Sequence, residues 1–79
     1  MQLRKPKADK EAIEREQFVA ALRSAQREYD VAVSCFGEAV EPEIIDESIF
    51  LMEAARKKYD YFLRRIRAAD ERASHFRRP

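Results

Sequence analysis

The residues that most often carry chemistry are scarce in this chain. Cys35 is the one cysteine and His75 the one histidine. A metal site would need partners at helical spacing, but His75 has only Glu71 one turn before it, and Arg72 stands where a Glu-x-x-His pair needs its glutamate. The sequence also has no Gly-rich phosphate loop and no nucleophile beside a base. We therefore expect no catalytic residue, no metal site and no cofactor, with Cys35 and His75 as ordinary structural or solvated side chains.

Two charged segments could bind partners instead. Residues 38–53 carry six acids and no base, which suits the start of a helix and could also attract a basic partner. The C-terminal part of the chain is rich in arginine, which could contact phosphates. The candidates for an anion or nucleic-acid contact are Arg64, Arg65, Arg67, Arg72, Arg77 and Arg78. Asp70 and Glu71 interrupt this run, and no helix-turn-helix, zinc or RNA-binding pattern accompanies it, so nucleic-acid binding is the alternative hypothesis.

Apolar spacing places these residues on two long helices. In the first half, apolar residues recur at alternating steps of four and three, from Phe18 to Phe36, as in a coiled-coil seam. Gly37 can end a helix in the left-handed conformation, and Pro42 suits the first turn of the next helix. The sequence thus predicts helices over about 9–36 and 42–76, with residues 1–8 as a basic, disordered tail and 77–79 as a basic end.

The second half repeats the seam, and a short connection makes two such helices antiparallel neighbours. The fold class is therefore all-α, an antiparallel two-helix hairpin. Its predicted core and interface residues are Phe18, Leu22, Tyr29, Phe36, Ile45, Ile49, Met52, Tyr59, Phe62 and Ile66. If the helices pair evenly outward from the turn, Tyr29 meets Met52, and Phe18 meets Phe62 and Leu63.

The chain has more apolar surface than one seam uses, because Val19, Val33, Leu51 and others lie beside it. Phe50 and Tyr61 form a second face. A 79-residue hairpin alone also buries little against the entropy of ordering it. We therefore expect a homodimer that forms a four-helix bundle, with Phe50 and Tyr61 as a candidate second interface.

Charge suggests how two copies would be oriented. Residues 1–10 and 64–79 together carry ten bases and three acids, so the open end of the hairpin is basic while the turn is acidic. This asymmetry is hidden by a net charge of +1. An antiparallel pair would place each acidic turn beside the other copy's basic end, which favours that orientation.

The segment Cys35–Arg67 resembles a known family. It carries Phe36 before the turn, Pro42 followed by Ile45 and Asp46, the pair Ala54–Ala55, then Tyr59, Tyr61 and Leu63 followed by Arg64. In these features it is similar to the YaaL-like family of small bacterial proteins of unknown function (domain-of-unknown-function family 2508). The resemblance implies a short helical hairpin in a bacterial cytoplasm, and it implies no catalytic residues.

Together these patterns predict a non-catalytic module that acts by protein–protein contact, as an adaptor or structural accessory. The sequence has no apolar run of membrane-spanning length, and its lone cysteine fits a reducing cytoplasm. We expect a cytoplasmic protein with a second copy or another protein as its partner, and with no membrane contact.

Overall fold

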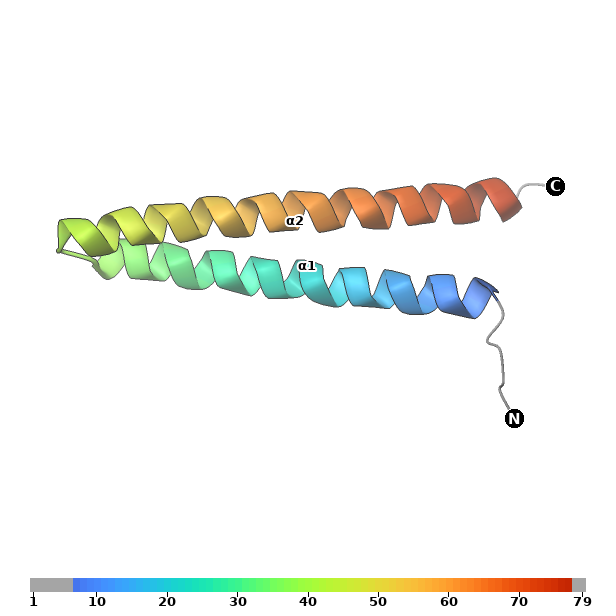
Figure 1. Ribbon diagram of the computed structural model, residues 1–79, viewed down its shortest axis with the longest axis horizontal. Helices are drawn as coiled ribbons and strands as arrows, with labels where there is room; N and C mark the ends of the chain where they lie inside the picture. The colour runs from blue at the N-terminus through green and yellow to red at the C-terminus, as the bar shows by residue number, and fades with distance from the viewer. Residues whose placement is uncertain (1–6, 78–79) are drawn as a thin grey trace, which may run out of the picture.

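The computed structural model describes residues 7–77 of the chain, with side chains described for residues 10–72. It contains two helices, α1 (Lys7–Glu38) and α2 (Pro42–Arg77), which lie side by side and antiparallel (Figure 1). The start of α1 and the end of α2 lie at the same end of the molecule, the open end of the hairpin. The predicted two-helix hairpin is confirmed. Helix α1 begins two residues earlier than expected, so Lys7 and Ala8 belong to it and not to a tail.

The turn differs from the prediction at Gly37. Helix α1 continues through Gly37 to Glu38, and no residue in the described range has a positive φ. The Ala39 N–H donates to the Cys35 carbonyl at 3.0 Å, which extends the helical bonding pattern past the glycine. The connection therefore reverses direction without a left-handed residue. Gly37 lowers the helix propensity of this turn but does not end α1 there.

Helix α2 begins where the sequence predicts. The Glu41 carbonyl accepts hydrogen bonds from the N–H groups of Ile44 and Ile45, at 3.1 and 3.0 Å. Pro42 occupies the first helical position, where its missing N–H leaves no bond unmade. Glu43 lies in the first turn, where negative charge complements the helix dipole.

Small side chains line the interior between the two helices. The most buried residues are Ala25 and Ala32 on α1 with Ser48 and Ala55 on α2, at 1–2% exposure. Each pair is spaced by one heptad, so the four residues lie along one seam. The Ser48 hydroxyl is satisfied within its own helix, because it donates to the Ile44 carbonyl at 2.8 Å. Larger side chains therefore flank this seam instead of filling it.

The predicted core of large residues needs correction at two positions. Phe36 and Ile49 are 42% and 40% exposed, because the small residues of the seam bring the helices together and leave these side chains at its edge. Ile66 is buried. The other predicted core residues are half-buried along both edges of the seam: Phe18, Leu22, Tyr29, Ile45, Met52, Tyr59 and Phe62.

Contacts between the helices fix the register. The rings of Phe18 and Phe62 lie 6.2 Å apart between centroids, as the even pairing predicts. Among residues 10–72, two ion pairs also join α1 to α2, with Glu28 to Lys58 at 3.1 Å and Arg15 to Asp70 at 2.7 Å. The second is bidentate, with another bond at 3.2 Å. These pairs are offset from the even pairing by about one helical turn.

The Arg15–Asp70 pair shifts the protonation of both groups. The hydrogen bond from Arg15, supported by the attraction between the charges, holds the pKa of the Asp70 carboxyl below its ordinary value. The same bond raises the pKa of the Arg15 guanidinium. Both side chains are exposed, so the pair serves mainly to set the register at the open end.

Candidate protein-interaction surface

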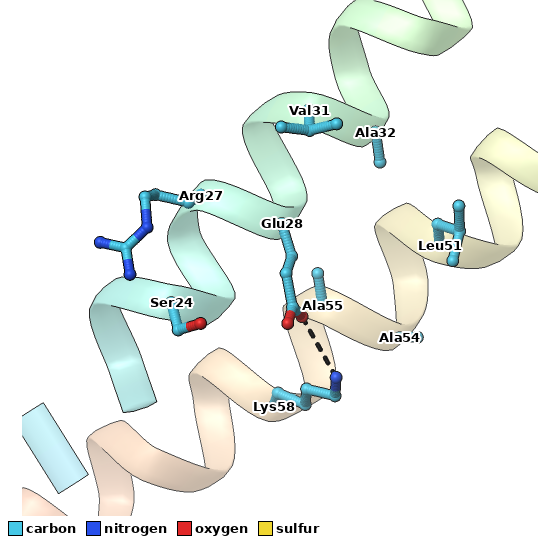
Figure 2. A pocket seen from close by; sticks show the side chains of 9 residues that line it. All are labelled: Ser24, Arg27, Glu28, Val31, Ala32, Leu51, Ala54, Ala55 and Lys58. Carbon is cyan, nitrogen blue, oxygen red and sulfur yellow. Dashed lines mark hydrogen bonds and ion pairs between the residues drawn. The ribbon is translucent and has the colours of Figure 1, made fainter. Parts of the chain in front are cut away.

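An open groove runs between the two helices on one side of the hairpin (Figure 2). It encloses about 520 Å³ and is lined mainly by apolar atoms. Its apolar lining comes from Val31, Ala32, Leu51, Ala54 and Ala55, and its polar lining from Ser24, Arg27, Glu28 and Lys58. We call the side of the hairpin that carries these residues the groove face.

The groove is shallow because its floor is alanine. Ala32 and Ala55 belong to the buried seam, while Val31 on α1 and Leu51 on α2 stand on either side of it. Val31 is 69% exposed and Leu51 47% exposed. Two aliphatic side chains thus face water on either side of alanines that are already buried between the helices.

An ion pair crosses the groove between the helices. Glu28 extends from α1 towards Lys58 on α2, with 3.1 Å between the carboxylate oxygen and Nζ (Figure 2). It lies on the open-end side of Ala55, and Ser24 lines the groove one turn further along α1. Both side chains of the ion pair are about half exposed, so they can turn towards a partner at little cost.

Aromatic residues cluster beyond this ion pair, further towards the open end. The Tyr61 ring meets the edge of Phe62 at 5.2 Å between centroids, and Phe62 contacts Phe18 on α1. The Arg65 guanidinium lies over the Phe18 ring, 5.2 Å from its centroid. Tyr61 is 47% exposed, so its ring projects into solvent while Phe62 packs against it from the side of Phe18. We call Tyr61, Phe62 and Phe18 the aromatic cluster.

The sequence singled out Phe50 and Tyr61 as a second face, and both are exposed on α2. Phe50 is the more exposed at 72% and stands beside Leu51. The two residues lie three turns apart and do not touch within one chain. Sequence reasoning missed Val31, whose signal was modest: an apolar residue next to the seam position of Ala32.

Side chains are described for four of the six candidate arginines. Arg64, Arg65, Arg67 and Arg72 are exposed at the open-end half of α2. Arg65 is partly occupied by its contact with Phe18. Arg77 and Arg78 lie outside the range whose side chains are described.

The acidic candidates surround the turn as the sequence indicates, and all are exposed: Glu38, Glu41, Glu43, Asp46, Glu47 and Glu53. Cys35 is a free, exposed thiol. Within the described part of the chain, no group of three His, Cys, Asp or Glu side chains could hold a metal ion. Neither helix, over its described length, has an apolar stretch that could cross a membrane.

Comparison with known proteins gives a family but no activity. A family model described as "Protein of unknown function (DUF2508)" matches residues 1–71. This match extends well beyond the segment Cys35–Arg67 on which the sequence resemblance rests. No curated protein and no solved structure matches the chain significantly.

Proposed function

The chain belongs to the family of proteins of unknown function DUF2508, and we propose that it is a non-catalytic helical hairpin that acts by protein–protein contact. In this proposal it serves as an adaptor or structural accessory, with a second copy of itself as the first partner. The free Cys35 is compatible with a reducing cytoplasm as the setting.

One observation carries the proposal. The hairpin buries its small residues most deeply and leaves several large apolar residues exposed. Alanine and serine fill the seam, while Val31, Leu51, Phe50 and Tyr61 are 47–72% exposed. A monomer gains nothing from such an arrangement, because exposed apolar side chains contribute little to its own stability. Apolar side chains gathered on one surface are instead typical of interfaces.

The mass of the protein in solution tests this proposal. We expect light scattering after gel filtration to give twice the chain mass at tens of micromolar, both at low salt and at about 1 M salt. Apolar contacts should survive the higher salt, because screening acts on charges. A protein that stays monomeric under both conditions would contradict self-association.

A second candidate function is nucleic-acid binding by the basic open end. The exposure of Arg64, Arg67 and Arg72 supports it, because phosphate contacts need accessible cations. Its test is titration with a duplex at two salt concentrations. Binding that weakens steeply with salt, and that falls when these arginines become alanine, would favour this alternative. Binding that is absent at low salt would remove it.

A further inference from the structure

We propose that the groove face binds the groove face of a second copy, with the two hairpins antiparallel. This inference rests on the proposed function and specifies its first interface. Each turn would lie beside the other copy's open-end half, and α2 would pack along α2 of the partner. The result is the four-helix bundle that the sequence suggests, now with an assigned face and register.

The first support is the spacing of residues along α2. On the groove face, successive residues follow steps of four and three, which is the spacing of a helix-packing seam. They are Glu47, Leu51, Ala54, Lys58, Tyr61 and Arg65. Five of the six are exposed and have large or charged side chains, while Ala54 is small and half-buried. Helix α2 thus carries a second seam that α1 does not cover.

The second support is that this seam is complementary to itself when reversed. It has an acid at the end near the turn, a base at the open-end side, and apolar residues between them. An antiparallel copy places Glu47 beside the partner's Arg65 and Leu51 beside the partner's Tyr61. A twofold axis makes each of these contacts twice. Parallel copies would set like charges side by side, which is unfavourable.

The third support is shape. The groove lies on the half of the hairpin near the turn, and the aromatic cluster lies on the other half. The antiparallel arrangement brings each projecting Tyr61 to the level of the partner's groove, between Val31 and Leu51. A ring that is 47% exposed in one chain would then pack against Val31 and Leu51 in the other, which are 69% and 47% exposed. Aromatic anchors seated in apolar grooves are the contacts that dominate interface energies.

The register is set by the same residues. Sliding one copy by a heptad in either direction places Leu51 against an alanine, Ala54 or Ala68, and moves Tyr61 away from the partner's Leu51 to the level of Ile44 or Lys58. The proposed register also sets Lys58, paired with Glu28, against the small side chain of the partner's Ala54. The small side chain of Ala54 therefore leaves enough space for the Glu28–Lys58 ion pair to stay intact in the dimer.

A second copy is the favoured occupant because this chain carries both the groove and the side chains that would fill it. Helix α2 carries both the groove residue Leu51 and the Tyr61 that would enter the partner's groove. It also carries both members of the Glu47–Arg65 charge pair, at the spacing that the antiparallel register requires. A different protein would have to supply both features independently.

Paired variants of two valines test the face. Val31→Asp places a charge in the groove, whereas Val33→Asp places one two residues later, on a different side of α1. Val33 is 40% exposed, so the control is the more disruptive substitution for the hairpin itself. We expect Val31→Asp and Tyr61→Ser each to raise the dimer Kd about tenfold or more, and Val33→Asp to change it little. Circular dichroism checks that all variants remain helical.

A charge exchange tests the orientation. At low salt, Glu47→Arg and Arg65→Glu should each raise the dimer Kd about tenfold, because each puts two like-charged contacts into the interface. The double variant should return to within about threefold of the wild type, since the contacts reform with signs exchanged. Arg56→Glu, on α2 but outside the groove, is the matched control and should have little effect.

The outcomes separate this proposal from the function on which it rests. A wild-type protein that is monomeric at tens of micromolar overturns both. A wild-type dimer whose Kd is unchanged by Val31→Asp, Tyr61→Ser and Glu47→Arg overturns the groove face but leaves self-association standing. A dimer weakened by both charge reversals and not rescued by their combination overturns the antiparallel register.

Discussion

Replacing Gly37 by alanine should stabilise the hairpin. The sequence alone places Gly37 at the helix end, in a left-handed conformation that alanine resists. The structure places it inside α1 without a positive φ. A Cβ atom built at this position meets nothing within 4 Å. Alanine would therefore adopt the native conformation without strain, and the unfolded chain would lose some of its freedom.

The size of the effect follows from the position. Gly to Ala at a compatible site adds about 0.4–1 kcal/mol to the free energy of unfolding. Gly37 is the penultimate residue of α1, so we expect a value of about 0.5 kcal/mol. For a domain of this size, that corresponds to a rise in Tm of about 2–4 °C. The reverse substitution, Ala20→Gly, at an exposed position in the middle of α1 should lower the free energy of unfolding by about 1 kcal/mol. It serves as the reference for the size of a glycine–alanine exchange in this helix.

Urea and thermal unfolding followed by circular dichroism at 222 nm measure both variants. Protein concentration must be the same in every experiment, because self-association would make the apparent stability depend on it. A Gly37→Ala variant that is destabilised by about 1 kcal/mol or more would refute the reasoning, and would show that the chain adopts the left-handed end at Gly37.

Three further predictions concern the seam and the open end. Ala25→Leu should lower the free energy of unfolding by about 1–3 kcal/mol in chemical denaturation, because Ala25 is 1% exposed between the helices and a larger side chain has no room there, whereas Ala20→Leu on the exposed side should be nearly neutral. Ser48→Ala should change the free energy of unfolding by less than about 1 kcal/mol, because the hydroxyl donates only to a carbonyl of its own helix. A larger loss would show that the hydroxyl also stabilises the contact with α1. Asp70→Asn should lose the stability that Arg15 gives the carboxylate. The pKa of Asp70 is lowered in the folded state, so this stability is present above the ordinary value near 3.8 and disappears as pH falls through the folded value. The difference from the wild type in urea unfolding should therefore shrink towards about pH 2, and a constant difference would contradict the linkage.

The number of helices, their antiparallel arrangement and the start of α2 follow from the sequence alone. Periodicity identifies amphipathic helices, and Pro42 marks a helix start for a steric reason that tertiary contacts do not alter. Gly37 was a weaker marker, because glycine tolerates a left-handed end but does not require one. The end of α1 was therefore placed too early.

The composition of the core was harder to predict. Ranking seam positions by apolar size favours Phe36 and Ile49, yet the structure buries Ala25 and Ser48 most deeply. Size and burial are opposed here, because two long helices approach most closely where their side chains are smallest. The signal in the sequence is the heptad spacing of small residues, Ala25 and Ala32 on α1 and Ser48 and Ala55 on α2.

The groove face could be predicted only in part. Phe50 and Tyr61 stood out as apolar residues beyond the seam, and both are exposed. Val31 and the ion pair from Glu28 to Lys58 depend on the register between the helices. Periodicity leaves that register uncertain by about one turn, so contacts across the hairpin required the structure.

The two ion pairs between the helices enclose very different lengths of chain. Glu28 and Lys58 are 30 residues apart in the sequence, whereas Arg15 and Asp70 are 55 apart. Contacts near the turn therefore close short loops, and those at the open end form only after most of the chain is in place. The two helices of such a hairpin are expected to pair first near the turn and then progressively towards the open end. Their amide protons should accordingly exchange faster towards the open end. During synthesis, the alanine floor and the groove above it can form before Arg15 meets Asp70. The surface proposed to recognise a second copy is thus among the first parts of the molecule to take shape.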